Sequence, residues 1–511
     1  MASTLVIGLD GANWGLIEDW LDAGRLPTIQ RLRSEGTHTV SESEYPPVTC
    51  PNWKCYSTSK NPGNLGVFWW ELIDIENREI TFPDSTAFQS AELWDYFGDE
   101  GLSWFSLNMP TTYPVRQIPH GDIVAGGPLC ADDGYTSDPT LQSTLEDRFS
   151  YRVRPSRALT STEGSEPEVQ EILELIGTRF DVLEWYLDEE DPEFAHVTLF
   201  LLNILQHYFW RESPVREAWE LIDERIGRLL DDDTNVVLMS DHGCSAVETI
   251  FHVNLWLAQE GYLSTTRSVS TVFDRFNLTK ERLSSFAEAL GVRELARKAP
   301  PELKNLFPQK GEGAKREAKA AIVDWDKSDA LASGQGPLYV SPGCPPETAD
   351  QLAADLEALE TPDGRPVANR VLPKDEAYSG RFMNIAPDFV IEQAPGVHIA
   401  DGIGHQSVFT EPTRWRAEND RDGLFLAWGP DVRSGELDRI SIRDIAPTIL
   451  HMNGLAVPTD MEGSILDIFT DGSGIDLKDV DERDPLPVGD RAGGDAGGVE
   501  GRLEDLGYLG Q

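Results

Sequence analysis

TLVIGLDG, residues 4–11, is a short apolar run that ends in an aspartate and a glycine. A continuous apolar run of this length is typical of a buried parallel strand. Two segments with helical periodicity follow, WGLIEDWLDAG at 14–24 and LPTIQRLRSEG at 26–36. Each places Leu, Ile or Trp three or four residues apart and ends at a glycine, which is a common helix stop. The sequence therefore begins with a predicted strand and two predicted helices.

Similar apolar runs recur further along the chain, with helical segments between them. They are HVTLFLL (196–202), NVVLMSD (235–241), DFVIEQ (388–393) and GLFLAWG (423–429). This alternation predicts an α/β fold, a doubly wound and mostly parallel sheet with helices on both faces. In such sheets the functional residues gather at the carboxyl ends of the strands.

The pattern divides the chain into a core, which contains a flap region, and two other regions. We predict a catalytic core made of residues 1–263 and 321–469. Within it, residues 68–150 are rich in Trp, Pro and Gly and are expected to form a flap over one edge of the site. Residues 264–320 are expected to be a basic helical insertion, and residues 470–511 an acidic tail rich in Gly and Asp.

The insertion at 264–320 differs from the rest of the chain in its charge. It has 12 Lys and Arg against 7 Asp and Glu, so its net charge is +5. One interpretation is a solvated helical hairpin. The other is a lid or a docking surface for an anionic substrate or a lipid headgroup, which would give peripheral contact with a membrane.

The whole chain is strongly acidic. It has 88 Asp and Glu against 43 Lys and Arg, a formal charge of −45. This balance argues against nucleic-acid binding, which depends on clustered basic side chains. The acidity is spread along the chain, which favours a salt-saturated cytoplasm such as that of halophilic archaea, where self-repulsion is screened. An acidic protein of a mesophile is the alternative.

The sequence also favours a cytoplasmic location. It has no run of 18 or more apolar residues that would cross a membrane. The start lacks the charged and long apolar regions of a signal peptide. The cysteines form no CxxC pair, which fits a reducing compartment and gives no thiolate metal site. They are Cys50, Cys55, Cys130, Cys244 and Cys344.

Asp10, Asp241 and His242 are candidate metal ligands at predicted strand ends. A carboxylate and an imidazole held together suit zinc or manganese. The alternative for Asp241 and His242 is an ordinary turn after a strand. Asp10 strengthens the metal interpretation, because a buried aspartate is costly unless it is paired or bound to a cation.

The segment YPPVTCPNW, 45–53, supplies a candidate nucleophile. Thr49 stands just before a helix expected to open at Pro51, and Asn52 lies beside it as a candidate phosphate-binding residue. A helix N-terminus offers free N–H groups and a positive dipole end to a phosphoryl group. A threonine hydroxyl becomes a nucleophile there only with help from a metal. The alternative role for Thr49 is a helix N-cap.

A further pair of candidates occurs in LLNILQHYFW, 201–210. Asn203 and His207 are four residues apart, so both would project from the same face of a helix. The alternative for His207 is a half-buried core histidine.

Taken together, these segments resemble the type I phosphodiesterase and nucleotide pyrophosphatase branch of the alkaline phosphatase superfamily. The resemblance covers about 400 residues and extends to non-catalytic segments such as VDWDKSDALA and ISIRDIAPTILHMNGLAVPTDMEG. It implies an alkaline phosphatase-like fold and two divalent ions, with zinc preferred over manganese or calcium. The first ion would be held by Asp10, Thr49, Asp241 and His242, and the second by Asn203, His207 and His405.

The sequence departs from the family pattern at several positions. Asn203 stands where the family has an aspartate, and a neutral amide is a poorer ligand for a divalent ion. Asn419 or Asp420 stands where relatives often show a histidine. His398 is a rival to His405 as the late ligand. Leu65 takes the place of a frequent histidine, and these departures leave nucleotide specificity open.

The resemblance implies a hydrolase of phosphodiester or pyrophosphate bonds, or of phosphomonoesters, that acts through a phosphothreonine at Thr49. Its partner would be a small phosphorylated substrate. One alternative is a phosphotransferase or mutase of the same superfamily, in which the group passes to an alcohol. The other is a degenerate, non-catalytic member that binds an anion.

Overall fold

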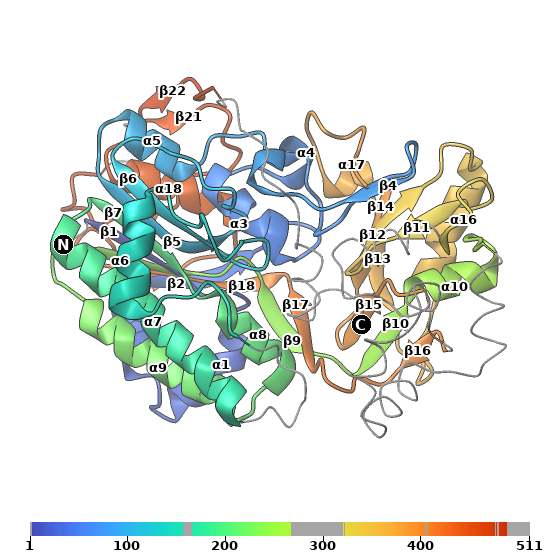
Figure 1. Ribbon diagram of the computed structural model, residues 1–511, viewed down its shortest axis with the longest axis horizontal. Coiled ribbons are helices and arrows are strands. Elements are labelled where there is room, and N and C mark those ends of the chain that lie inside the picture. The colour runs from blue at the N-terminus through green and yellow to red at the C-terminus, as the bar shows by residue number, and fades with distance from the viewer. Residues whose placement is uncertain are drawn as a thin grey trace, which may run out of the picture.

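The structure, a computed structural model, describes residues 3–156, 166–266, 320, 322–403, 405, 407–475, 477 and 480–487. Figure 1 shows a larger and a smaller lobe. The larger lobe is built on a main sheet, in which the described residues form nine strands, and helices pack on both of its faces. The predicted α/β class is therefore confirmed.

The centre of the main sheet is parallel. In order, its strands are β19 (Gly435–Glu436), β2 (Thr37–Glu42), β18 (Asp422–Trp428), β8 (Asn235–Met239), β1 (Thr4–Gly8), β7 (Phe194–Thr198), β5 (Trp104–Pro110) and β6 (Gly121–Gly126). β1 pairs in parallel with β7 and β8, and β5 pairs in parallel with β7 and β6. β18 runs antiparallel to both β8 and β2, and β20 (Ile440–Ser441) pairs with β2.

Two apolar layers cover this sheet. One contains α1 (Trp14–Asp22), α2 (Pro27–Glu35), α6 (Pro139–Phe149), α7 (Glu166–Glu190), α8 (Phe200–Phe209) and α9 (Ser213–Leu229). The other contains α3 (Thr49–Thr58), α5 (Leu93–Asp99) and α18 (Ile445–Met452), with α4 (Pro62–Leu65) and η2 (Ile442–Asp444) beside them. The two helices predicted from the N-terminal segments are confirmed as α1 and α2. Burial on both faces explains why the central strands read as continuous apolar runs.

The register of the central strands brings the candidate residues together. Gly8, the last residue of β1, is level with Thr198 of β7 and Met239 of β8. The segments that follow these three strands therefore leave the sheet at the same edge. Asp10 and Asp241 lie in two of these segments, and the third leads into α8.

The smaller lobe packs around its own apolar cluster. It has a sheet of β15 (Val397–Ala400), β10 (Thr249–His252) and β16 (Phe409–Thr410). A second, antiparallel sheet contains β11 (Ala330–Ala332), β12 (Pro337–Val340), β14 (Phe389–Gln393) and β13 (Ala368–Pro373). The helices of this lobe are α10 (Val253–Glu260), α16 (Pro346–Glu357) and α17 (Lys374–Ala377).

A short antiparallel ribbon lies between the lobes in Figure 1. It consists of β9 (Gly243–Ala246) and β17 (Ala417–Asp420). In its register Asn419 lies opposite Cys244, two residues after His242. The ribbon thus carries the segment around Asn419 to the carboxyl edge of the main sheet.

Two segments differ from the sequence-based expectations. The run 196–202 is not one strand, because β7 ends at Thr198 and α8 begins at Phe200. An apolar run reads the same in a buried strand and in the first turn of a buried helix. The run 388–393 forms a strand, β14, but in the antiparallel sheet of the smaller lobe.

The range 68–150 is more than a flap, because it supplies β5 and β6 to the main sheet. It also holds the hairpin of β3 (Leu72–Asp74) and β4 (Glu79–Thr81), and the turn η1 (Ser85–Ala87). The basic insertion at 264–320 falls almost wholly outside the described residues. Of the tail, β22 (Glu482–Arg483) is described and pairs with β21 (Val457–Pro458), and the residues from 488 onward are outside the described part.

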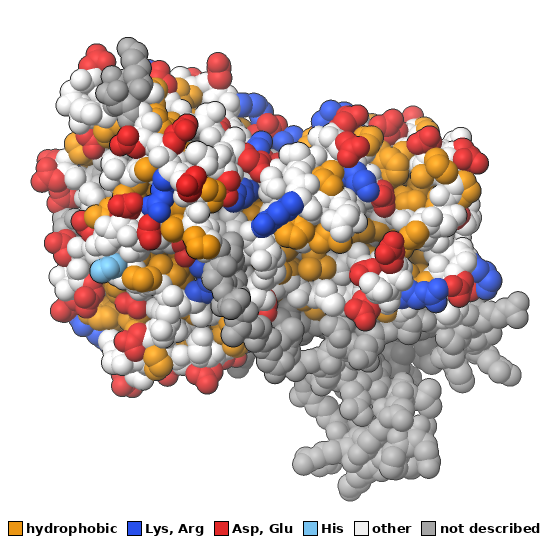
Figure 2. Space-filling view, turned by 90° about the horizontal axis from the view of Figure 1, so that it is seen from above, with side chains coloured by type: hydrophobic (Ala, Val, Ile, Leu, Met, Phe, Trp, Pro, Cys, Tyr) orange, Lys and Arg blue, Asp and Glu red, His pale blue; other side chains and the backbone are white. Residues whose placement is uncertain are grey.

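Acidic side chains are scattered over the face shown in Figure 2 and are not gathered into one block. This agrees with the even spread of acidic residues along the sequence. None of the described helices is long and apolar enough to cross a membrane.

Candidate functional site

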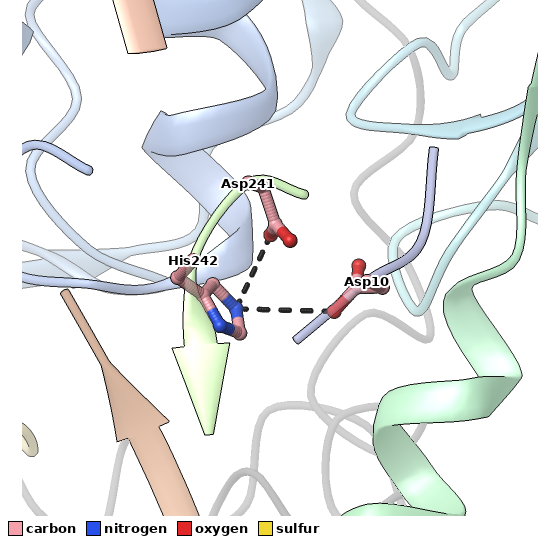
Figure 3. A group of neighbouring side chains, drawn as sticks. All are labelled: Asp10, Asp241 and His242. Atoms are coloured by element: carbon pink, nitrogen blue, oxygen red, sulfur yellow. Dashed lines mark ion pairs between the residues drawn. The ribbon is translucent and has the colours of Figure 1, made fainter. Parts of the chain in front are cut away.

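Asp10, Asp241 and His242 meet at the carboxyl edge of the main sheet, and their side chains are fully buried (Figure 3). Each offers a ligand atom, and these atoms all lie within 4.8 Å of one another. His242 Nε2 is 3.2 Å from Asp241 Oδ2 and 3.8 Å from Asp10 Oδ1. Among the described residues this is the one cluster of acidic, histidine or cysteine side chains with the geometry of a metal site.

The bonding of His242 fixes which ring nitrogen faces the cluster. Its Nδ1 is 2.8 Å from the carbonyl oxygen of Gly243, which can only accept a hydrogen bond, so Nδ1 carries the proton. Burial lowers the pKa of His242 to about 3, so the ring is neutral at pH 7. Nε2 therefore presents a lone pair, which is the form of histidine that binds metals.

Hydrogen bonds from neighbouring segments hold the two carboxylates in place. Asp10 Oδ2 accepts from the indole Nε1 of Trp53 at 2.9 Å, and Asp241 Oδ1 accepts from the backbone N–H of Gly11 at 3.3 Å. Asp241 Oδ2 has no hydrogen-bond partner among the described residues. Burial raises the pKa of Asp10, and burial together with the charge of Asp10 raises the pKa of Asp241.

These contacts fit a bound cation. Asp241 Oδ2 and His242 Nε2 face each other at 3.2 Å, although neither atom carries a hydrogen when the carboxylate is ionised. Two lone pairs so close repel each other unless a positive charge lies between them. Carboxylate oxygens and a neutral imidazole are ligands that zinc and manganese accept. The donor set therefore suits a divalent ion.

Thr49 lies directly against this cluster. Its Oγ1 is 3.1 Å from His242 Nε2 and 3.5 Å from Asp10 Oδ1. It is the first residue of α3, two residues earlier than the helix start expected at Pro51. The N-cap is Val48, so Thr49 does not have the alternative role of N-cap. Its hydroxyl thus lies both at the metal cluster and at the positive end of the helix dipole.

Asn52 contacts the loop before the helix. Its Nδ2 donates to the carbonyl oxygens of Pro46 and Val48, each at 3.0 Å, and its Oδ1 accepts from the N–H of Glu44 at 2.8 Å. The carboxamide thereby fixes the backbone that leads to Thr49. The role of Asn52 in binding phosphate stays a prediction, and in this arrangement its carboxamide holds the loop that precedes Thr49.

Asn203 and His207 lie on α8 and are both fully buried. Asn203 hydrogen-bonds with the carboxylate of Asp10, and its Nδ2 donates to Asn419 Oδ1 at 3.4 Å. His207 donates from Nδ1 to the carbonyl oxygen of Ala417 at 2.8 Å. Burial lowers the pKa of His207 to about 4, so this ring is also neutral.

The two late histidines lie in different settings. His405 stacks on His252, with ring centroids 3.7 Å apart and planes 21° apart. His398 Nδ1 is 2.5 Å from Glu418 Oε2, and this buried carboxylate also accepts from the indole of Trp415 at 2.9 Å. Neither histidine belongs to the Asp10 cluster, and the assignment of His405 as a ligand stays a prediction.

Sequence reasoning missed two residues of this region, Trp53 and Glu418. Trp53 follows Thr49 by one helical turn, and this spacing on the helix of Thr49 is the signal that could have indicated it. Glu418 gave no comparable signal, because two of its partners, Gln335 and His398, lie far from it in the sequence.

The model of the type I phosphodiesterase / nucleotide pyrophosphatase family matches residues 4–420. The chain belongs to this family. The match spans both lobes and includes every candidate residue named above. Family membership makes the protein a phosphoric ester hydrolase.

Solved structures share the fold of this family member at low sequence identity. Phosphonoacetate hydrolase from Sinorhizobium meliloti 1021, in complex with phosphonoformate, gives a TM-score of 0.57 at 14% identity and covers 87% of this chain and 94% of its own. Murine ectonucleotide pyrophosphatase / phosphodiesterase 5 gives a TM-score of 0.50 at 14% identity. The similarity covers 92% of this chain and 100% of the murine chain. No curated protein matches the sequence significantly.

Proposed function

We propose that the protein hydrolyses phosphodiester or pyrophosphate bonds, or phosphomonoesters, with Thr49 as the nucleophile. Asp10, Asp241 and His242 would hold a divalent ion, for which zinc is the first choice and manganese or calcium the alternatives. The observation that carries the proposal is the position of Thr49 Oγ1, 3.1 Å from His242 Nε2 and 3.5 Å from Asp10 Oδ1.

The reaction would proceed in two displacements. When bound, the ion supplies the positive charge that favours the ionised form of a nearby hydroxyl. Oγ1 of Thr49 attacks phosphorus in line, the bond to the leaving oxygen breaks, and the hydroxyl proton passes to that oxygen or to water. Water then cleaves the phosphothreonine and restores the hydroxyl.

The surroundings of Thr49 support this role. The N-terminal end of α3 adds positive potential where phosphoryl charge would develop. Trp53 and Asn203 hydrogen-bond to Asp10 and so hold its carboxylate in place.

Substitution of Thr49 tests the proposal. Thr49→Ala should reduce turnover of a nitrophenyl phosphodiester or nitrophenyl phosphate by at least about 10³-fold. The circular dichroism spectrum and zinc content should stay close to wild type, because three ligands remain. Wild-type rates in this variant would refute the nucleophile assignment. Product analysis with added alcohol separates hydrolysis from transfer to an acceptor.

We also propose that the enzyme works in the cytoplasm of a halophilic organism. The support is the net charge of −45 and its even distribution. The basic insertion at 264–320 remains a candidate for contact with an anionic substrate or a lipid headgroup, because it gathers positive charge in an acidic chain.

A further inference from the structure

Two asparagines lie in contact beside the candidate metal cluster. Asn203 and Asn419 are 0% and 1% exposed. Asn203 Nδ2 donates to Asn419 Oδ1 at 3.4 Å, and the Asn203 side chain also hydrogen-bonds with the carboxylate of Asp10. We call these two side chains the carboxamide pair.

The fold brings the carboxamide pair to this position from two distant segments. Asn203 lies on α8, which leaves the same edge of the sheet as Asp10. Asn419 lies on β17, whose pairing with β9 places it opposite Cys244, two residues after His242. The pair fits closely against the loop of Asp10, because a Cβ atom added at Gly11 would lie 2.3 Å from Asn203 Oδ1.

The chemistry of this pair does not suit a second divalent ion. A carboxamide is neutral and cannot offset the charge of a divalent cation, whereas zinc sites in proteins are built with thiolate, imidazole and carboxylate ligands. The N–H₂ group of Asn203 donates toward Asp10 and Asn419. That half of the carboxamide therefore presents hydrogens, not lone pairs, to its surroundings.

The neighbouring carboxylate does not make up for the missing charge. Glu418 precedes Asn419 in the chain, but its oxygens already accept from Gln335 and Trp415 and pair with His398 at 2.5 Å. A carboxylate with these partners is compensated where it stands. The N–H₂ group of Asn419 has no partner among the described residues, which leaves one more donor beside the carboxamide pair.

We infer that this chain holds one divalent ion, on Asp10, Asp241 and His242, and that the carboxamide pair stands in place of a second. The inference rests on the proposed function and deepens it. The hydrogen bond from Asn203 to Asp10 partly neutralises the carboxylate, as a second cation would do more strongly. His207 is then a core histidine held by Ala417, which is the alternative role considered for it.

The number of zinc ions bound per chain tests this inference directly. The full-length protein is stripped with a chelator, loaded with zinc chloride in high salt, desalted and analysed by inductively coupled plasma mass spectrometry. Because the acidic surface binds zinc weakly, Asp241→Asn treated in the same way provides the background. The wild type should hold one equivalent of zinc per chain above that background.

A gain-of-site variant gives the second arm of the experiment. Asn203→Asp combined with Asn419→His supplies a carboxylate and an imidazole at the same positions and should raise the count to two equivalents. One equivalent in a folded double variant would contradict the claim that the carboxamide pair excludes the second ion. If the double variant does not fold, the wild-type count decides alone.

The outcomes separate the inference from the function on which it rests. Two equivalents in the wild type, with activity that depends on Thr49, would overturn the inference and leave the proposed function standing. No zinc above the background, and no manganese or calcium in parallel loadings, would overturn the proposed function, and the inference with it.

Discussion

Replacement of Trp53 by phenylalanine should weaken metal binding without touching a ligand. The indole Nε1 donates to Asp10 Oδ2 at 2.9 Å, while Asp10 Oδ1 is the oxygen that faces Thr49 and His242. A hydrogen bond to a charged group contributes about 1.5–3 kcal/mol. Since about 1.4 kcal/mol corresponds to a factor of ten, Trp53→Phe should raise the zinc Kd by roughly 10- to 100-fold.

The assay is a competition titration against a chromophoric zinc chelator at pH 8, with circular dichroism to confirm the fold. Trp94→Phe is the matched control. Trp94 is also fully buried in the same apolar layer, and its indole N–H has no partner among the described residues. The Trp94→Phe substitution therefore removes the same ring volume without removing a hydrogen bond to Asp10. An unchanged Kd in Trp53→Phe, or an equal rise in Trp94→Phe, would refute the reasoning.

Three further outcomes follow from the charges of the protein. Burial raises the pKa of Asp10 and Asp241 above 3.8, so the folded, metal-free protein binds protons that the unfolded chain releases. Its stability should fall as pH rises above about 4. Thermal unfolding of chelator-treated protein should therefore show a higher Tm at pH 5 than at pH 8, by a margin that shrinks in Asp241→Asn. Burial opposes the ionisation of Glu418, but the interaction with His398 outweighs the effect of burial and holds the pKa of Glu418 at about 2. This carboxylate therefore stabilises the fold at neutral pH and loses its effect only as pH falls toward 2. Glu418→Gln should cost about 3–5 kcal/mol in urea unfolding at pH 7, and a cost below about 1 kcal/mol would contradict this account. Raising KCl from about 0.1 M to about 2 M should raise the Tm, because screening relieves the repulsion of a chain with charge −45, and a flat response would argue against a halophilic setting.

Strand-end reasoning predicted that Asp10 and Asp241 would come together. Asp10 and Asp241 each follow an apolar run, and parallel strands with level ends bring such residues together. The position of Thr49 was predicted from a helix start expected at Pro51. The helix begins two residues earlier, and the hydroxyl of Thr49 still lies in its N-terminal turn. These inferences needed only local patterns and one general property of parallel sheets.

The contacts around the centre could not be predicted in the same way. The bond between Asn203 and Asn419 joins residues 216 positions apart and depends on the four-residue strands β9 and β17. Strands that short carry little periodicity. Glu418 contacts Gln335, His398 and Trp415, and no local pattern specifies that these side chains meet.

Trapping the covalent intermediate tests the central claim most directly. The enzyme is mixed with a phosphodiester substrate, quenched with acid during turnover, digested and analysed by mass spectrometry. The account predicts a substrate-derived phosphoryl group on Thr49 in the wild type and its loss in Asp241→Asn. A phosphoryl group on another residue, or full turnover by Thr49→Ala, would contradict the account.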